Sequence, residues 1–309
     1  MAGRDPRADI LDNNPFSNIK PKIHRIHSST SDDGTIHINV GGARTSFSNK
    51  TKPKTDTSIW HFSDIEKQHL RLATAAFTLA LGFIAVRGLS GISTLGLNKW
   101  LITLLLAMPV MLLAVGPAFI LHEIGHKIVA KRYGCWAEFR ADPKGLQFGI
   151  ILSFFLGVLF MAPGAVMVSG LFQRRYNGYV AVAGPLTNLT LFIIGIPMWI
   201  LILGISGAFD FTHTSLFDNG LSLNVYLDGN KILWKSMLID AGIVWLYANL
   251  ILGLFNMIPW GPLDGAKVKD WSEPVFYFVF CIFLIPVIGM ILGLWNPKTL
   301  LSGCVGLIF

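Results

Sequence analysis

Long apolar stretches separated by short polar connections make up most of the chain beyond about residue 60. Four of them, at 70–86, 179–203, 237–257 and 274–294, reach or approach the roughly 20 apolar residues that span the hydrocarbon core of a bilayer. A fifth uncharged run, at 101–121, leads into a short segment with several ionisable groups. This pattern predicts an all-α polytopic membrane protein with about five to six spanning helices.

The amino-terminal segment has a different composition, because it is rich in Ser, Thr, Asn, Asp, Lys and Arg. Such a segment has little apolar surface to bury. We therefore expect residues 1–58 to form a polar, basic, mostly disordered cytoplasmic tail and residues 59–309 to form a membrane-embedded domain. Within the tail, residues 34–40 alternate like a short strand, and the Gly-Gly pair that follows predicts the turn of a small hairpin.

Local signals predict where the first two long helices begin and end. The sequence Ser63-Asp-Ile-Glu66 is a capping box, which predicts the start of the first helix. In the second helix, Pro109 fits the first turn and Pro117 predicts a kink. Gly134 is a natural end for that helix.

The second helix carries the sequence His-Glu-Ile-Gly-His at 122–126. Residues four apart lie on the same face of a helix, so His122 and His126 can direct two imidazoles at one metal ion. Glu123 lies one step around the helix, which suits a general base acting on metal-bound water. Ionisable groups inside an apolar span are costly and by default mark a functional site.

Two other interpretations of this segment remain open. Glu123 and Lys127 are four residues apart and could form a helical ion pair near a membrane surface. Alternatively, His, Glu and Asp within membrane helices can form the path of a zinc or other metal-ion transporter. A transport path usually needs successive sites at different depths, whereas a hydrolase needs one cluster with a base.

Composition supports the membrane assignment and limits the other classes. The chain has 309 residues, of which 52% are hydrophobic and 14% charged, well below the roughly 25% charged residues of soluble domains. Its three cysteines form no CxxC pair, so neither a disulfide framework nor a cysteine zinc site is expected. The net charge of +7 is unevenly distributed along the chain and reports membrane topology; we expect no nucleic-acid partner.

A catalytic zinc site takes three protein ligands and one open position, so two histidines leave one ligand to be found. The other ionisable groups of the membrane region are Asp240, near the start of the stretch at 237–257, and Asp264, just after it. Asp264 lies in Pro-Leu-Asp-Gly, which could equally be a plain turn.

The distribution of basic residues favours Asp264. Eleven of the 25 Lys and Arg residues precede residue 72, seven lie in 122–176 and two lie in 257–273. The positive-inside rule then places the tail, the end of the second helix and Asp264 on the cytoplasmic side. An even number of crossings must therefore separate His126 from Asp264.

The apolar stretch at 148–169 would break this requirement if it crossed the membrane fully. We therefore predict that it is re-entrant, with the reversal at Met161-Ala-Pro-Gly-Ala165, because Pro and Gly interrupt helices. Non-helical backbone is tolerated at membrane depth when protein buries it or water reaches it. Small residues around Gly125 and Gly184 could leave room for that water.

Four motifs together resemble the site-2 protease family of intramembrane zinc metalloproteases. They are His-Glu-Ile-Gly-His in a membrane helix, Ala-Pro-Gly-Ala-Val at 162–166, Gly-Pro-Leu-Thr-Asn at 184–188, and Asn256-x-x-Pro-x-x-Pro-Leu-Asp-Gly265. The similarity covers about residues 119–271. It implies a re-entrant, β-like segment between the second and third spans, beside the active site.

The resemblance also implies a role for individual residues. It implies that His122, His126 and Asp264 hold one Zn²⁺ per chain, that Glu123 is the catalytic base, and that Asn188 contacts the substrate or the reacting carbonyl. Pro163 and Gly164 of the re-entrant segment are expected to bind substrate, because that segment could pair with an unwound helix as an added strand. The expected substrate is a single-span membrane protein cleaved within the bilayer. We expect the enzyme to be a multi-pass protein of the cell membrane.

Overall fold

The computed structural model of the chain divides into two compact units, Met1–Asp56 and Thr57–Phe309. The structure describes residues 27–30, 36–40, 43–47, 58, 60–170, 173–208, 216 and 225–308.

The first unit holds a three-stranded antiparallel sheet in the order β1-β2-β3. Its strands are β1 (His27–Thr30), β2 (Ile36–Val40) and β3 (Ala43–Phe47). Val40 pairs with Ala43, so the predicted hairpin is confirmed. The other residues of the expected disordered tail lie outside the described residues, and the division of the chain at residue 58 stays a prediction.

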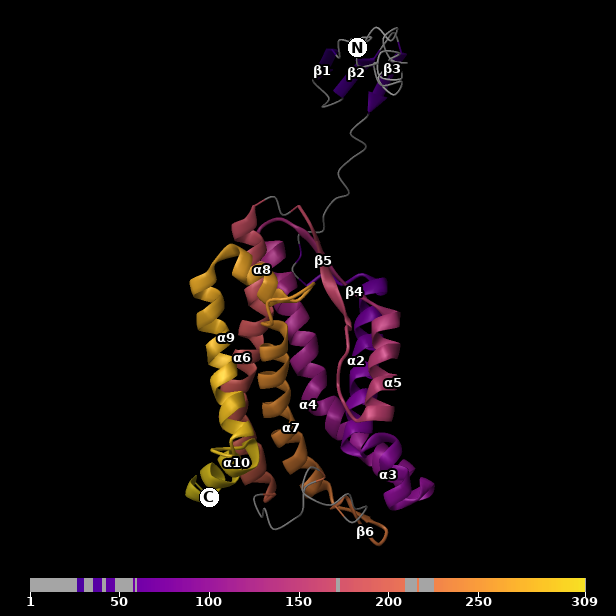
Figure 1. The fold of residues 1–309 in the computed structure, drawn as a ribbon, viewed down its shortest axis with the longest axis vertical. Helices are drawn as coiled ribbons and strands as arrows, with labels where there is room; N and C mark the ends of the chain where they lie inside the picture. The colour runs from indigo at the N-terminus through magenta and orange to yellow at the C-terminus, as the bar shows by residue number, and fades with distance from the viewer. Residues whose placement is uncertain are drawn as a thin grey trace, which may run out of the picture. The chain divides into compact units, whose positions relative to one another are not determined.

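The second unit is mostly helical, with two small two-stranded antiparallel sheets, β4-β5 and β6-β7, at its connections (Figure 1). Its helices are α2 (Asp64–Ala85), α3 (Gly88–Leu95), α4 (Leu97–Arg132), α5 (Pro143–Leu156), α6 (Arg174–Ser206), α7 (Trp234–Asn256), α8 (Asp264–Trp271), α9 (Glu273–Ile291) and α10 (Pro297–Ile308). Its strands are β4 (Trp136–Ala141), β5 (Gly164–Ser169), β6 (Leu227–Asp228) and β7 (Lys231–Ile232).

Four helices of the described residues, α4, α6, α7 and α9, are long and apolar enough to cross a membrane. A fifth span results if α2 and α3, which are bent by 46° relative to each other, are counted together. The apolar carboxyl-terminal helix α10 has only 12 residues. The described part of the chain therefore supports a multi-pass protein with four or five spans, and not the sixth that the sequence left possible.

Helix boundaries follow the local signals in two places and depart from them in one. The backbone N–H of Glu66 donates to Ser63 Oγ (3.2 Å), which confirms the start of α2. Gly134, at φ +73°, follows the last turn of α4 as expected. The placement of Pro109 in the first turn of α4 is wrong, because the helix begins at Leu97. A helix packed among other helices tolerates an internal proline, since its neighbours compensate the lost hydrogen bond.

The stretch at 148–169 is not one continuous helix. It continues α5 to Leu156, reverses after Gly157, which has φ +66°, and returns as strand β5. The chain reverses before the predicted site at 161–165. Ala162 already packs against the first turn of α5, since a Cβ on Gly145 would lie only 2.2 Å from its carbonyl oxygen. β5 pairs antiparallel with β4, and Ser169 lies opposite Trp136; that the stretch is re-entrant in a membrane stays a prediction.

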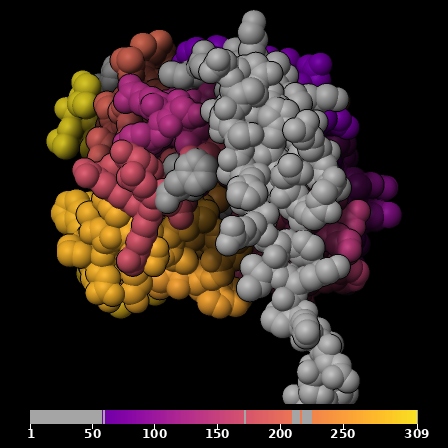
Figure 2. Space-filling model, turned by 90° about the horizontal axis from the view of Figure 1, so that it is seen from above, coloured from indigo at the N-terminus to yellow at the C-terminus, as the bar shows by residue number. Residues whose placement is uncertain are grey.

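The long helices alternate in direction (Figure 1). α4 and α7 run towards the end at which α8 lies, whereas α6 and α9 run away from it. Figure 2 views this end, where a pink segment separates the magenta end of α4 from the orange segment that includes α8 and α9. The helical arrangement therefore brings the last turns of α4 close to the start of α8.

Candidate metal centre

Two histidines from α4 and one aspartate from α8 converge in the interior of the second unit. The Nε2 atoms of His122 and His126 are 3.1 Å apart. Oδ2 of Asp264, the first residue of α8, lies 3.0 Å from His126 Nε2 and 3.4 Å from His122 Nε2. All three residues are buried, and they form the single potential metal-binding cluster of His, Cys, Asp and Glu in the described residues.

The other ring nitrogen of each histidine is engaged by an oxygen atom. His122 Nδ1 lies 2.6 Å from Oδ1 of Asn188, and His126 Nδ1 lies 2.7 Å from the carbonyl oxygen of Val180. An acceptor at Nδ1 keeps the proton on that nitrogen and leaves Nε2 as a lone-pair donor. Helix α6, which carries both acceptors, therefore fixes the tautomer and the orientation of both imidazoles.

Gly184 of α6 makes the space in which the two rings lie. A Cβ at this position would come within 2.5 Å of Nε2 of both His122 and His126. The glycine of the Gly-Pro-Leu-Thr-Asn motif is thus required for close approach of α6 to the histidines. The space beside it is filled by the imidazoles, so Gly184 accommodates the ligands and not the water expected from the sequence.

Asp264 is held as a carboxylate. Burial alone would raise the pKa of Asp264, but when His126 and His122 carry protons on Nε2 they outweigh burial and hold that pKa well below its ordinary value; a cation in the place of those protons acts with the same sign. Its second oxygen, Oδ1, lies 3.5 Å from Nζ of Lys267, one turn further along α8. One oxygen therefore faces the imidazoles while the other faces a lysine.

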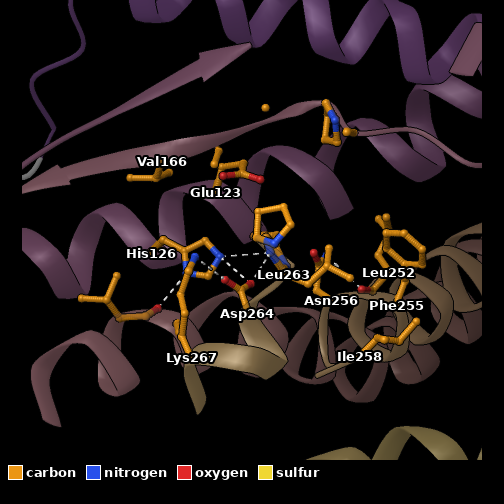
Figure 3. Close-up of a pocket in the computed structure, with 18 of the residues that line it drawn as sticks. Glu123, His126, Val166, Leu252, Phe255, Asn256, Ile258, Leu263, Asp264 and Lys267 are labelled. Atoms are coloured by element: carbon orange, nitrogen blue, oxygen red, sulfur yellow. Dashed lines mark hydrogen bonds and ion pairs between the residues drawn. The ribbon is translucent and has the colours of Figure 1, made fainter. Parts of the chain in front are cut away.

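A pocket of about 790 Å³ opens directly onto this cluster. Glu123 lines it and lies beside Val166 of β5, on the side of the His126–Asp264 contact that faces this strand (Figure 3). Pro163 and Gly164 also line it, at the start of β5. On the side of α7 and the connection to α8, the wall consists of Leu252, Phe255, Asn256 and Ile258. Near the start of α6 it consists of the polar residues Gln173, Arg174 and Asn177.

The donor set fits zinc. Two neutral imidazoles and one carboxylate are a frequent ligand set of catalytic zinc sites, which keep a further position open for water or substrate. The three donor atoms lie within 4.8 Å of one another, and the pocket adjoins them. Glu123 is adjacent to the cluster but not part of it, as expected for a base.

The ion pair considered between Glu123 and Lys127 is not formed. Lys127 instead donates to Oε2 of Glu66, on α2, at 2.5 Å. The basic residue of the motif is thus turned away from the pocket, and Glu123 is left on the pocket wall.

Asp240, the second candidate for the third ligand, lies in a separate cluster. Its Oδ2 accepts hydrogen bonds from the Tyr226 hydroxyl (2.7 Å) and the backbone N–H of Leu216 (3.0 Å). It is fully buried and belongs to no metal-binding cluster found among the described residues. Of the two aspartates, only Asp264 is brought to the histidines.

Asn188 lies behind His122. It is fully buried, it is not among the pocket-lining residues, and its Nδ2 donates to Asn249 Oδ1 (3.0 Å) and the Ala118 carbonyl (3.1 Å). This placement does not support the expected contact with substrate and indicates that Asn188 orients His122. Asn249 was missed in the sequence, although an amide in the middle of an apolar span is itself a signal of function.

Comparison with known proteins assigns this arrangement to a family. The model of peptidase family M50 matches residues 110–270, which include both histidines, Glu123 and Asp264. The chain belongs to peptidase family M50. The resemblance to the site-2 protease family is therefore confirmed, and the protein is a zinc metallopeptidase of the membrane.

Curated relatives agree with this assignment. The chain is 35% identical over 189 residues to "Putative zinc metalloprotease MJ0611" of Methanocaldococcus jannaschii, covering 61% of this chain and 81% of the relative. It is 26% identical over 186 residues to "Putative zinc metalloprotease YwhC" of Bacillus subtilis, covering 58% and 75%. A 149-residue match at 27% identity to "Zinc metalloprotease MJ0392" of Methanocaldococcus jannaschii covers 48% and 30%. No solved structure matches the chain significantly.

Proposed function

We propose that this M50 peptidase hydrolyses a peptide bond in or near the transmembrane helix of a single-span membrane protein, as in regulated intramembrane proteolysis. The observation that carries the proposal is the buried cluster of His122, His126 and Asp264 at a pocket bordered by strand β5. One such cluster among the described residues, with an adjacent carboxylate, favours hydrolysis over metal-ion transport.

One zinc ion per chain would be held by Nε2 of His122, Nε2 of His126 and a carboxylate oxygen of Asp264. When bound by such a set, zinc supplies an acidified water molecule and polarises a carbonyl group. Glu123 would accept the proton of the attacking water at a carboxylate oxygen. It would then deliver that proton to the amide nitrogen as the carbon–nitrogen bond breaks, leaving a carboxylic acid and an amine.

Strand β5 is suited to hold the substrate in an extended form. Val166 lies opposite Phe139 of β4, and the N–H of Phe139 points away from β5, towards Glu66. In an antiparallel pair, opposite residues share this orientation, so the backbone groups of Val166 point to the free edge of β5. Val166 and Val168 line the pocket. A locally unwound helix could therefore add to this edge, beginning near Pro163 and Gly164.

Several features support a cell-membrane location with the tail and the active site towards the cytoplasm. The four candidate spans support a multi-pass protein. The last turns of α4 and the start of α6 carry clustered basic residues, which the positive-inside rule assigns to the cytoplasmic side: Lys127, Lys131, Arg132, Arg174 and Arg175.

Substitution of Glu123 by Gln tests the proposed chemistry. The variant should retain about one zinc per chain, because Glu123 is not in the ligand set, but should lose cleavage of single-span substrates. Zinc content and proteolysis are measured on the same preparation in lipid nanodiscs. Glu273→Gln, at an exposed position on α9, is the matched control and should cleave normally. Normal turnover by Glu123→Gln would refute the assignment of the base.

The proposed topology can be tested by chemical labelling. Single cysteines at Asn177 and Lys269, in a chain lacking Cys135, Cys281 and Cys304, should react with an impermeant thiol reagent from the same side of sealed, oriented vesicles. Labelling from opposite sides would contradict the re-entrant arrangement of α5 and β5.

The substrate mode predicts a dependence on helix-breaking residues. Unpaired backbone groups in lipid cost several kcal/mol each, so a helix must unwind before its carbonyl is accessible. Gly, Asn or Pro near the cut should promote cleavage, and the cut should lie towards the cytoplasmic end. Mass spectrometry locates the cut, and replacement of those residues by Leu should slow cleavage. An equally fast all-leucine substrate would contradict strand addition.

A further inference from the structure

One face of helix α2 covers the edge of β4 that is not paired with β5. The backbone N–H of Phe139 donates to Oε1 of Glu66 (3.1 Å), and the N–H of Ala141 donates to Nδ1 of His69 (3.2 Å). Glu66 and His69 are three residues apart on the helix, while Phe139 and Ala141 are two apart on the strand. One turn of the helix therefore places two side-chain acceptors opposite two successive outward N–H groups of the strand. These side chains take the place of the carbonyl groups of a neighbouring strand.

This cover leaves the two-stranded sheet with one edge available for pairing. An uncovered edge strand pairs readily with another chain, and covering the edge prevents it. Helix α2 occupies the edge of β4 at Phe139 and Ala141, whereas the edge of β5 at Val166 faces the pocket. An extended peptide can therefore add only on the side of the sheet that faces the metal centre.

The same glutamate also binds the metal-binding helix. Oε2 of Glu66 accepts from Nζ of Lys127 at 2.5 Å, and Lys127 directly follows His126 on α4. Both residues are about 1% exposed. Lys127 also donates to the carbonyl oxygen of His61 (2.7 Å) and lies 3.7 Å from the centre of the Phe62 ring. The ammonium group is therefore fixed on several sides.

We propose that Glu66 is a positioning residue that sets the distance between the substrate-binding strand and the metal centre. The inference rests on the proposed function of β5 and adds to it a residue outside the four motifs. One carboxylate holds β4, and through it β5, with Oε1, while Oε2 holds the turn of α4 that carries His126. Peptide hydrolysis requires the scissile carbonyl to lie in contact distance of the reacting groups, and a misplacement of about 1 Å can lower the rate about a hundredfold.

A simple stabilising ion pair explains these contacts less well. Buried ion pairs are often no more stabilising than packed apolar residues, because both charges lose their hydration. Glu66 instead divides its two oxygens between two elements of the active site. Glutamine retains the size of the side chain but has an N–H₂ group at one of the two oxygen positions, so either Phe139 or Lys127 faces a donor in place of its acceptor.

The test compares Glu66→Gln with Asp64→Asn, an exposed acidic position on the same turn of α2. We measure kcat, KM and zinc content in nanodiscs, and amide hydrogen exchange of residues 136–141. Glu66→Gln should lower kcat at least about tenfold, with KM within about threefold and zinc retained, since the strand still binds substrate but holds it in the wrong place. Exchange of the β4 amides should rise at least about tenfold, and Asp64→Asn should change none of these quantities.

A second variant keeps the test decisive if the buried charge is needed for folding. His69→Leu removes the other contact to β4 without exposing a buried charge, and Gln68→Leu is its neighbouring control. His69→Leu should lower kcat severalfold with zinc retained and should raise hydrogen exchange at the Ala141 amide, whereas Gln68→Leu should change neither. Unchanged kcat and exchange in folded Glu66→Gln or His69→Leu would overturn the inference, as would loss of zinc in parallel with activity.

Hydrogen exchange separates this inference from the proposed function. If the unaltered protein cleaves no single-span substrate but Glu66→Gln still frees the β4 amides, the proposed function fails and the contact role of Glu66 stands. If the unaltered protein cleaves and Glu123→Gln does not, while Glu66→Gln cleaves at the normal rate, the positioning role alone is wrong.

Discussion

Two buried aspartates lie near opposite ends of α7, and they differ in what surrounds them. Asp240, in the first turns of the helix, accepts from a tyrosine hydroxyl and a backbone N–H. Asp264, beyond the end of the helix, faces two imidazole nitrogens and a pocket. In the sequence both were acidic residues at the border of an apolar span, and both could have been the third ligand.

The difference lies in the partners of each carboxylate. The Tyr226 hydroxyl and the Leu216 N–H both bring hydrogen atoms of their own to Asp240 Oδ2, so these two contacts need no metal ion. Burial, and then the neighbouring Asp240, raise the pKa of Tyr226, which keeps its hydroxyl protonated as a donor. The imidazoles around Asp264 have their protons on the far nitrogen, so three lone-pair donors face one another. Such a set is stable only when a cation or a proton lies between the donors.

The largest expected effect distinguishes the two aspartates directly. Asp264→Asn should lose zinc and lower cleavage by at least about a thousandfold, the scale at which removal of a principal catalytic group acts. Asp240→Asn is the matched control, because it makes the same change at an equally buried position of the other cluster. Zinc is measured by elemental analysis after dialysis. Equal zinc retention by the two variants would show that Asp264 is not a ligand.

A smaller effect is expected behind the metal centre. Asn188→Ala removes the acceptor at His122 Nδ1, and loss of such an outer partner typically weakens metal binding about 10- to 100-fold. Competition with a chelator measures the affinity. Thr190→Ala, at an exposed position two residues further along α6, should leave the affinity unchanged. Unchanged zinc affinity together with a raised KM would instead return Asn188 to the role of a substrate contact.

The Asp240 cluster should affect stability without affecting zinc. Asp240→Asn should lower the free energy of unfolding by roughly 2–3 kcal/mol, because an amide N–H₂ group replaces one acceptor in a buried site. Thermal unfolding in detergent follows the change, and zinc stoichiometry should remain that of the unaltered protein. A loss of zinc by the folded variant would contradict the separation of the two clusters.

The smallest effect is expected at the hydroxyl partner of Asp240. Tyr226→Phe preserves the ring and removes one hydrogen bond, while the backbone N–H of Leu216 still donates to the carboxylate. We expect a loss of about 1–2 kcal/mol in unfolding free energy and unchanged cleavage per folded molecule. A larger loss than in Asp240→Asn would show that the ring, and not the hydrogen bond, holds the connection before α7.

The proximity of His122, His126 and Asp264 could be predicted from the sequence because helical spacing and topology determine it. Helical spacing alone brings His122 and His126 together, and the crossing count brings Asp264 to them. The role of Asn188 could not be read in the same way, because it depends on how far α6 is rotated towards α4. That rotation is set by packing, with Gly184 against the imidazoles, and no periodic pattern records it.

Other differences have similar causes. The capping box marked the start of α2 but gave no indication that Glu66 would bind Lys127 and Phe139, since those partners are 61 and 73 residues away. The reversal after α5 occurs at Gly157 because a left-handed glycine ends the helix there, before the Pro-Gly sequence at which it was predicted. The start of α4 was missed because its first turns carry the charged and polar residues Asn98 and Lys99.

The contact between Gly184 and the two imidazoles has a genetic consequence. Since the rings of His122 and His126 occupy the volume in which a side chain at 184 would lie, the three positions share one fixed space. The methyl group added by Gly184→Ala can be accommodated in two ways: α6 moves away from α4, or one histidine is replaced by a smaller side chain. The second way removes a metal ligand. Suppressors of that variant should therefore map to the interface of α4 with α6 and never to the histidines, so the spacing of these helices is inherited together with the ligand set.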